Sequence, residues 1–320
     1  MVRSLRVLLA FAVGLVAAAQ SVSAQERKLV VYTANYRVSD ALVAAYQKLN
    51  PGVKVSAVSG STGPIAERAV AEMRNPQADI VYLFNGQTLE RLRDAGVFQP
   101  YRPRNAAIPD EHMDPDGFFT LHMFNSMAML VNKERLARRK LPMPTTWAHL
   151  LNPAFKGEIT VASPIKSGTG VTIYLTLLDA FGWNFIEHLD ANVFAYNDGG
   201  GSAGQQAGAG EISIGLTHDA AAFEQVAAGR PVEIVFPDIL PSNFQGGGLV
   251  KGAPNAEEGK RFLDFLATRE AAEIMSPFVT ATTVPGISRM PEGHRVIWGD
   301  PKRPIDQRAF LDEWKKRFPR

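Results

Sequence analysis

Short apolar runs alternate with amphipathic helical patterns along most of this 320-residue chain, and that alternation restricts the folds it can adopt. Lys28 to Thr33 and Val53 to Val58 are rich in β-forming residues, while Asp40 to Leu49 between them carries apolar residues at helical spacing. A strand, a helix and a second strand in this order form a βαβ unit with parallel strands. The pattern therefore predicts parallel sheets covered by helices, as in α/β proteins.

The alternation continues along the chain, with one long interruption. Further strands are predicted at Ala78 to Leu83, Glu158 to Ala162, Val193 to Tyr196, Ile212 to Leu216 and Val232 to Phe236. Further helices are predicted at Ile65 to Met73, Thr88 to Asp94, Gly170 to Phe181 and Ala203 to Ala209, and in the C-terminal region. The run from Phe118 to Asn132 is about 15 residues long, against a usual strand length of roughly 5 or 6. We expect it to cross between two lobes, with Pro237 to Gly248 as the return crossing.

These signals predict a two-lobed α/β fold, in which each lobe is a mixed, mostly parallel sheet flanked by helices and crossover hinge strands join the lobes. We assign residues 25–122 with about 243–288 to lobe 1, and 123–242 with about 289–320 to lobe 2. Removal of residues 1–24 leaves 296 residues, enough for two lobes with cores of their own.

The N-terminus has the features of a secretory signal peptide. Arg3 and Arg6 precede an apolar run from Val7 to Ala19, and Val22 to Ala24 offers small residues for cleavage. A membrane anchor is the alternative, but the apolar run is shorter than the roughly 20 residues that a spanning helix needs. We therefore predict export to the periplasm with cleavage near Ala24.

Charge and cysteine content exclude several classes of function. Cleavage removes two arginines and no acidic residue, so the 34 basic and 32 acidic residues become 32 of each, which argues against a nucleic-acid partner. The chain has no cysteine, which excludes thiolate metal sites and thiol catalysis. Five histidines show no metal-ligand spacing, and we interpret them as surface or satisfied polar groups: His112, His122, His149, His188 and His294. No cofactor and no metal site is predicted.

Several segments together resemble one known group, the type II periplasmic binding proteins, in the subgroup of ferric-iron, thiamine, phosphonate and phosphoglycerate binders. They are LVVYTA, NPQADIVY, TTWAHLLNPAFKGEITVASPIKSGTG, GEISIGLTHDAA and LVKGAPNAEEGKRFLDFLATREAAEIM. The resemblance implies a protein that closes on its solute and delivers it to the membrane permease of an ABC importer. It implies no bond-making chemistry and no catalytic residue.

Iron is one alternative that the resemblance raises. Similar ferric-iron binders place a His, a Glu and a Tyr-Tyr pair where this chain has Tyr36, the Phe84–Asn85 region and Ala220–Ala221. Ferric iron prefers anionic oxygen ligands, which alanine does not supply. Iron binding then requires Tyr32, Tyr36 or Tyr196 to converge with an external anion.

The candidate binding residues lie in loops that follow predicted strands, because the cleft of an open α/β sheet forms at the carboxyl ends of its strands. Ser59 to Gly63 and Ser167 to Thr169 each precede a predicted helix, whose free N–H groups and dipole favour phosphate or carboxylate. The alternative is an ordinary N-cap turn without a ligand. The predicted ligand-binding residues are Asn35, Tyr36, Ser59, Gly60, Ser61, Thr62, Phe84, Asn85, Ser163, Ser167, Gly168, Thr169, Gly201, Ser202, His218 and Asp219.

Some of these residues have other interpretations. Gly200 to Gly204 matches the G-x-S-x-G pattern of serine hydrolases, with Ser202 as nucleophile, and His218 is the nearby histidine. Asp219 is equally suited to contacting ligand hydroxyls or a cationic group and to capping a helix. Tyr36 and Phe84 stack on a ligand or belong to the core.

We therefore predict the periplasmic solute-binding component of an ABC importer, a monomer that captures a phosphonate, organophosphate or carboxylate by hinge closure. The alternatives are a ferric-iron or iron–anion binding protein, a secreted serine hydrolase using Ser202, and a sensor partner that presents a ligand.

Overall fold

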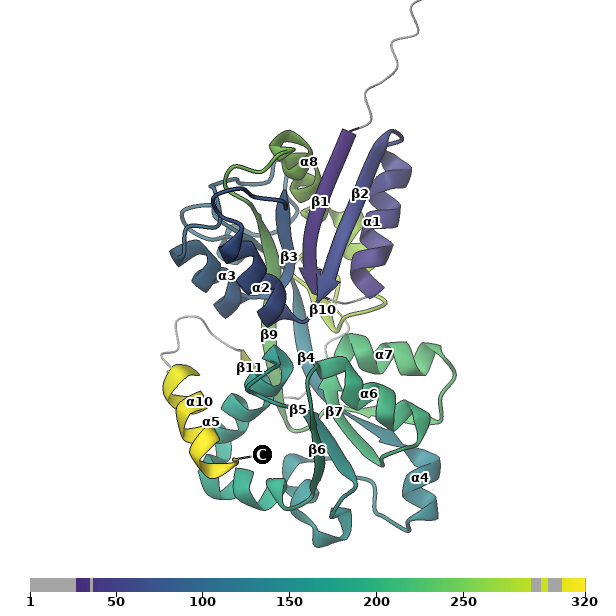
Figure 1. Ribbon diagram of the computed structural model, residues 1–320. Coiled ribbons are helices and arrows are strands. Elements are labelled where there is room, and N and C mark those ends of the chain that lie inside the picture. Colours follow the sequence, from purple (N-terminus) through teal and green to yellow (C-terminus); the bar gives the residue numbers. More distant parts are fainter. Residues whose placement is uncertain (1–26, 35–36, 289–294, 299–306, 320) are drawn as a thin grey trace, which may run out of the picture.

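The computed structural model describes residues 27–34, 37–288, 295–298 and 307–319, with only the backbone of 295–298 and 307 (Figure 1). The predicted signal peptide lies outside these ranges. Within them, no helix is both long and apolar enough to cross a membrane.

The first lobe is built on three parallel strands. These are β1 (Arg27–Ala34), β2 (Val53–Gly60) and β3 (Ile80–Asn85), in the order β2-β1-β3. The helices of this lobe are α1 (Arg37–Leu49), α2 (Thr62–Ala71), α3 (Gly86–Asp94), α8 (Ala256–Leu266) and α9 (Arg269–Met275) (Figure 1). Its core contains Leu29, Tyr82 and Phe262.

The second lobe repeats this arrangement. Its parallel strands are β5 (Ile159–Ala162), β6 (Val193–Asn197) and β7 (Ile214–His218), in the order β7-β5-β6. Its other elements are α4 (Lys133–Arg138), α5 (Gly168–Asp190), α6 (Gly200–Ala209), α7 (Asp219–Ala227), β8 (Val232–Val235) and α10 (Gln307–Arg317). Its core contains Trp147, Phe155 and Tyr174.

Two long strands join the lobes, β4 (Thr120–Asn132) and β9 (Ile239–Leu249). Residues 120–126 of β4 pair with β9, whereas residues 127–132 pair with β7 and β8 of the second lobe. Strand β9 continues to β3 of the first lobe, and the short strands β10 (Ala281–Thr282) and β11 (Arg295–Trp298) pair with β4 and β9. The predicted two-lobed fold with crossover strands is confirmed, and the residue-level lobe boundaries stay a prediction.

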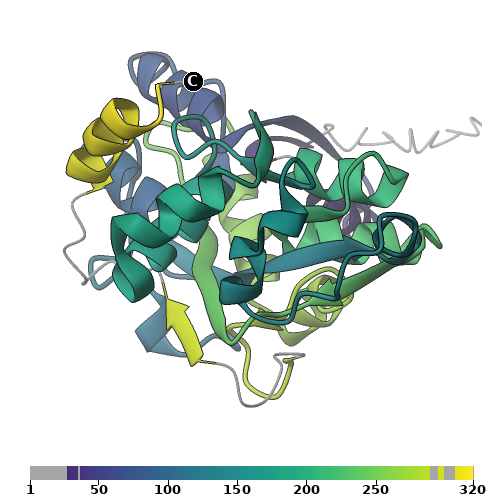
Figure 2. The ribbon, with the colours of Figure 1, turned by 90° about the horizontal axis from the view of Figure 1, so that it is seen from below.

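The C-terminal helix α10 packs on the second lobe. Figure 2 shows α10, in yellow, beside the teal helix α5. The Trp314 ring lies 4.4 Å from the Tyr174 ring, measured between centroids, and both residues are buried. Burial of one large side chain contributes on the order of 2 kcal/mol, so this contact anchors the end of the chain.

Two helices next to the cleft begin earlier than predicted, each at a glycine. Helix α5 begins at Gly168 and α6 at Gly200, two and three residues before the predicted starts. The first part of α5 ends where predicted, because Gly182 has φ 77°, and a second helical segment then runs to Asp190. Glycine is a poor helix former in isolation, so tertiary packing decides these starts.

His122 corrects a sequence-based interpretation. Its side chain is fully buried, and neither ring nitrogen has a hydrogen-bond partner among the described residues. The ring instead lies edge-on to Tyr82, with centroids 5.4 Å apart. Burial lowers the pKa of His122 from 6.5 to about 3. The interpretation of His122 as a surface or satisfied polar group is therefore wrong.

This burial predicts a specific loss of stability in acid. The unfolded chain binds a proton at His122 below about pH 6.5 while the folded chain does not, so stability falls as the pH drops from there. The native protein should lose roughly 2 kcal/mol of unfolding free energy at this site between pH 7.5 and pH 5, and the His122→Leu variant should not. Urea unfolding at both pH values measures this. The same replacement at exposed His188 is the control, and an equal stability difference at both pH values would refute the prediction.

Candidate ligand-binding cleft

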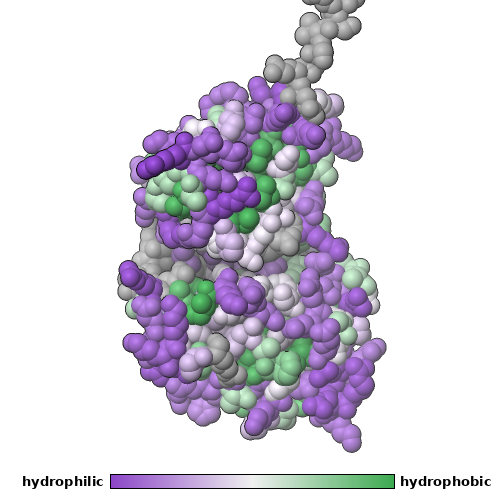
Figure 3. Space-filling model, in the orientation of Figure 1, coloured by the Kyte–Doolittle hydropathy of each residue, from purple (hydrophilic) through white to green (hydrophobic). Residues whose placement is uncertain are grey.

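A cleft of about 560 Å³ lies between the two lobes. It is lined by Ala34, Arg37, Val38, Asp40, Gly60, Ser61, Thr62, Asn85, Asn125, Lys166, Ser167, Gly168, Thr169, Asp198, Gly199, Gly200, Gly201, Ser202, Gln205, His218, Ala220, Ala221, Glu224, Gln225, Asn243, Gln245 and Phe278. Most of these residues are polar or charged or are glycines. The outer surface in the view of Figure 3 is likewise mostly hydrophilic. The cleft is therefore a polar site with room for an organic molecule rather than a single ion.

The carboxyl ends of the parallel strands point at this cleft from both sides. Ala34, Gly60 and Asn85 are the last residues of β1, β2 and β3, and all three line it. From the second lobe, β7 ends at His218, and β6 ends one residue before Asp198. This is the position that open α/β sheets use for ligands.

Two serines at helix starts, one from each lobe, face the cleft. Ser61 is the N-cap of α2 and Ser167 the N-cap of α5, both with extended backbone. Neither side chain caps its own helix in the part of the chain that the structure describes. By contrast, the N-cap Thr268 of α9 accepts a hydrogen bond from the Ala271 N–H. The ordinary-cap alternative therefore does not account for Ser61 and Ser167.

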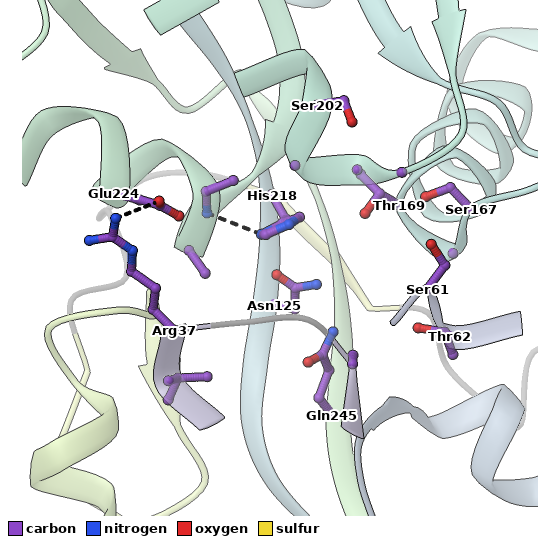
Figure 4. Close-up of a pocket in the computed structure, with 18 of the residues that line it drawn as sticks. Arg37, Ser61, Thr62, Asn125, Ser167, Thr169, Ser202, His218, Glu224 and Gln245 are labelled. Carbon is purple, nitrogen blue, oxygen red and sulfur yellow. Dashed lines mark hydrogen bonds and ion pairs between the residues drawn. The ribbon is translucent and has the colours of Figure 1, made fainter. Parts of the chain in front are cut away.

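The cleft has two chemically different ends. Ser61, Thr62, Ser167, Thr169 and Ser202 gather at one end, and we call these five residues the hydroxyl cluster (Figure 4). A Cβ atom added to Gly200 would lie 2.1 Å from Thr169 Oγ1, so α6 approaches α5 closely here. One added to Gly168 would lie 2.9 Å from Asn85 Nδ2, which shows that the lobes also approach each other here.

The opposite end carries charged side chains. Arg37 of α1 forms an ion pair with Glu224 of α7, at 2.9 Å, and so connects the two lobes across the cleft (Figure 4). A second ion pair, Lys166 with Asp198 at 2.7 Å, lies on the second lobe beside the hydroxyl cluster, because Lys166 directly precedes Ser167, and both of its side chains are exposed. Four of the charged side chains that line the cleft therefore neutralise each other in two pairs.

His218 lines the cleft as a neutral side chain. Its Nδ1 accepts a hydrogen bond from the Ala221 N–H at 3.2 Å, and it caps α7. Burial lowers the pKa of His218 to about 4. Since Nδ1 accepts, the proton of the neutral ring resides on Nε2. Such a ring can donate a hydrogen bond to a ligand, but it lacks the free Nε2 lone pair that activation of Ser202 requires.

Asp219 is used in the protein interior. It is fully buried and does not line the cleft. Its carboxylate accepts hydrogen bonds from the Ala220 N–H and from both the N–H and the hydroxyl of Thr280. Burial raises the pKa of Asp219 to about 6, although these donors lower it. Its position ties the start of α7 to the segment before β10, instead of exposing it to a ligand.

The structure brings ten of the sixteen predicted ligand-binding residues into the cleft lining. They are Gly60, Ser61, Thr62, Asn85, Ser167, Gly168, Thr169, Gly201, Ser202 and His218. That they bind a ligand stays a prediction. Asn35 and Tyr36 lie outside the described residues.

Besides Asp219, three predicted residues fall outside the lining. Ser59 is exposed within β2, because that strand continues to Gly60. Phe84 is fully buried in the core of the first lobe, as aromatic residues beside a sheet commonly are. The Ser163 hydroxyl accepts a hydrogen bond from the Ile165 N–H within the turn after β5.

Sequence reasoning missed the cleft residues on the crossing strands and on α1 and α7. Asn125 comes from β4, and Asn243 and Gln245 from β9, while Arg37 and Glu224 come from the two helices. The available signal was three carboxamides inside segments that were already expected to cross between lobes. Their common face follows only from the register of the two strands.

Tyr32 and Tyr196, two of the tyrosines considered as iron ligands, form hydrogen bonds away from the cleft. The Tyr32 hydroxyl donates to Glu72 and the Tyr196 hydroxyl to Asp190, each at 2.7 Å, and neither residue lines the cleft. No cluster of three or more His, Asp or Glu side chains suited to a metal occurs among the described residues. Tyr32 and Tyr196 therefore do not supply the phenolate ligands that ferric-iron binding in the cleft requires.

Comparisons with known proteins give the same picture of the fold. The model of the family described as bacterial extracellular solute-binding protein matches residues 75–303. Iron uptake protein A2 of Synechocystis is 25% identical over 308 residues, covering 87% of this chain and 85% of that protein. A putative 2-aminoethylphosphonate-binding periplasmic protein of Salmonella typhimurium is 25% identical over 236 residues, covering 69% and 66%. The solved structure of the periplasmic binding protein AfuA of Actinobacillus pleuropneumoniae, with fructose-6-phosphate bound, has a TM-score of 0.78 at 22% identity, covering 92% and 99%.

Proposed function

We propose a transport function for this chain, which belongs to the family of bacterial extracellular solute-binding proteins. It is the periplasmic binding component of an ABC importer, and it captures a small anionic solute in the cleft between its lobes. The solute is a phosphonate, an organophosphate or a carboxylate. The binding protein acts as an exported monomer whose partner is the importer's membrane permease.

One observation carries the anionic part of this proposal. Ser61 and Ser167 stand at the starts of helices from opposite lobes, both line the cleft, and neither hydroxyl caps its own helix within the described chain. Each helix start supplies free N–H groups and the positive end of a helix dipole. An anion held between them gains hydrogen bonds from both lobes at once, which favours the closed arrangement.

The ion pair at the other end of the cleft supports a closure mechanism. Arg37 and Glu224 can approach to 2.9 Å only when α1 and α7 face each other across the cleft. Because Arg37 is 63% exposed, the pair contributes little by itself. Closure therefore depends on the ligand's contacts with both lobes, and release of the ligand reopens the cleft.

Binding without catalysis is the function that the cleft chemistry favours. His218 presents a protonated Nε2 and so is not a general base for Ser202. Asp219, the carboxylate next to it in sequence, is held by Thr280 and Ala220. The predicted signal peptide and the periplasmic relative support export.

The proposal is tested by paired N-cap replacements. The double variant Ser167→Ala, Thr169→Ala should bind an anionic ligand at least tenfold more weakly. It loses about two hydrogen bonds to a charged group, and their combined free energy corresponds to more than a tenfold change in affinity. Ser167→Ala alone should change the unfolding free energy by less than about 0.5 kcal/mol, since Ser167 does not cap its helix. Any further loss of stability in the double variant comes from Thr169, which is buried against α6. Isothermal titration with inorganic phosphate, 2-aminoethylphosphonate, fructose 6-phosphate, citrate and ferric citrate measures the affinities.

Thr268→Ala is the matched control. This N-cap does hold its own helix, so its loss should cost about 1 kcal/mol of stability and leave ligand affinity unchanged. If a ligand binds the double variant as tightly as it binds the native protein, the helix-start site is incorrect. Binding of ferric citrate alone, with a tyrosinate absorption band, would instead support iron transport.

A further inference from the structure

The floor of the cleft consists of three carboxamide side chains, Asn125, Asn243 and Gln245, which we call the amide floor. Asn125 on β4 is paired directly with Asn243 on β9, and Gln245 lies two residues farther along β9. Directly opposed residues, and residues two apart, share a face of an antiparallel ribbon. All three side chains line the cleft, and their exposures are 2%, 4% and 3%.

The orientation of Asn243 follows from its hydrogen bonds. The Thr172 hydroxyl donates to the Gly168 carbonyl at 2.9 Å, so it can only accept from Asn243, whose Nδ2 lies 2.7 Å away. The Oδ1 atom of Asn243 therefore faces away from Thr172. It is buried and has no hydrogen-bond partner among the described residues. Leaving a buried acceptor unpaired is costly, so the floor is suited to a donor on the bound molecule.

Among the described residues that line the cleft, none supplies a buried carboxylate at the amide floor for a ligand ammonium group. The acidic residues in the described lining are Asp40 and Asp198, which are exposed, and Glu224, which is half-buried. Asp198 and Glu224 already pair with Lys166 and Arg37 at the rim. A buried ammonium group needs an ionised partner, whereas a hydroxyl group is satisfied by neutral amides.

We infer that the solute is an anion whose remaining part carries several hydroxyl groups, such as a phosphorylated sugar or polyol. Its anionic group lies at the hydroxyl cluster, and its hydroxyl groups contact the amide floor. In Figure 4, Asn125 and Gln245 lie between the hydroxyl cluster and the Arg37–Glu224 pair, so one molecule can reach both. A cleft of about 560 Å³ leaves room for a body beyond the anion. The inference rests on the proposed function, because it requires the anion at the helix starts.

Isothermal titration of the mature protein with four probes tests the inference. The probes are fructose 6-phosphate, 2-aminoethylphosphonate, inorganic phosphate and fructose. Fructose 6-phosphate should bind at least tenfold more tightly than the other three. If 2-aminoethylphosphonate binds as tightly as fructose 6-phosphate, the hydroxyl inference fails while the anion site stands. If none of the phosphorus-containing probes binds, the inference of a phosphorylated solute fails, and the proposed function then depends on its carboxylate alternative, which the titration with citrate tests.

Variants of the amide floor separate its role from that of the hydroxyl cluster. Asn243→Ala and, independently, Asn125→Ala should each reduce affinity for fructose 6-phosphate about tenfold and leave affinity for inorganic phosphate within twofold. Circular dichroism checks folding, and Asn125→Ala retains the test if Asn243→Ala does not fold. Gln77→Ala, an exposed amide outside the cleft, should change neither affinity. Equal losses for fructose 6-phosphate and phosphate in a folded variant would overturn the inference.

Discussion

Replacing Gly170 with alanine should lower the free energy of unfolding by about 3 kcal/mol and abolish ligand capture. Gly170 lies in the first turn of α5, and a Cβ there would be 2.4 Å from the Ala162 carbonyl oxygen and 2.7 Å from the Pro164 nitrogen. Both are backbone atoms, which cannot rotate away as a side chain can. The clash can therefore be relieved only if α5 moves away from the end of β5, which also displaces Ser167 and Thr169. Urea unfolding and titration with fructose 6-phosphate measure the two effects.

Gly63→Ala provides the matched control. Gly63 is also in the first turn of a helix beside the cleft, but nothing lies within 4 Å of a Cβ added to it, and its φ is not positive. Alanine there should leave stability unchanged or raise it by up to about 1 kcal/mol, because it restricts the unfolded chain. If Gly170→Ala behaves like Gly63→Ala, close packing of α5 against β5 is not what positions the Ser167 turn.

The parts of the fold that depend on local pattern were predictable. Lys28 to Thr33 and Val53 to Val58 appear within β1 and β2, and the long run ending at Asn132 appears as β4. These segments differ from their surroundings in apolar periodicity, which a single sequence contains. The starts of α5 and α6 were predicted too late, because close contacts between elements, rather than helix propensity, hold glycines there in helical conformation.

The candidate site was predictable only where local chemistry marks it. Ser61 and Ser167 stand between a strand and a helix, which is visible in sequence. The face shared by Asn125 and Asn243 depends on pairing between residues 118 positions apart. Likewise, Asp219 is removed from the cleft by Thr280, 61 residues away. The rule that ligands bind at the carboxyl ends of strands identifies the segments near the cleft. Contacts with residues distant in sequence then decide which side chains of those segments face it.

Removal of Glu158, a buried carboxylate of the second lobe, should cost far more stability than removal of an exposed acidic residue. Glu158 is 2% exposed and lies 2.8 Å from both Arg135 Nε and Arg139 Nε. It also accepts a hydrogen bond from the Ser213 hydroxyl at 2.6 Å. Burial raises the pKa of Glu158, but hydrogen bonds from Arg135 and Ser213 outweigh it, so the pKa is lowered. The carboxylate thus joins α4 to the strands that carry the cleft.

Glu158→Ala should therefore lower the free energy of unfolding by about 3 to 5 kcal/mol at pH 7, because it leaves Arg135 partly buried without its partner. Glu134→Ala, which breaks the exposed pair with Arg138, should cost no more than about 0.5 kcal/mol. Since the folded-state pKa of Glu158 is depressed, its contribution is present above the unfolded value of 4.5 and disappears as the pH falls through the lowered folded value. Urea unfolding at pH 7 compares the two variants. Equal costs would mean that the buried network does not hold β5 in place, and that the strand-end geometry of the cleft has another origin.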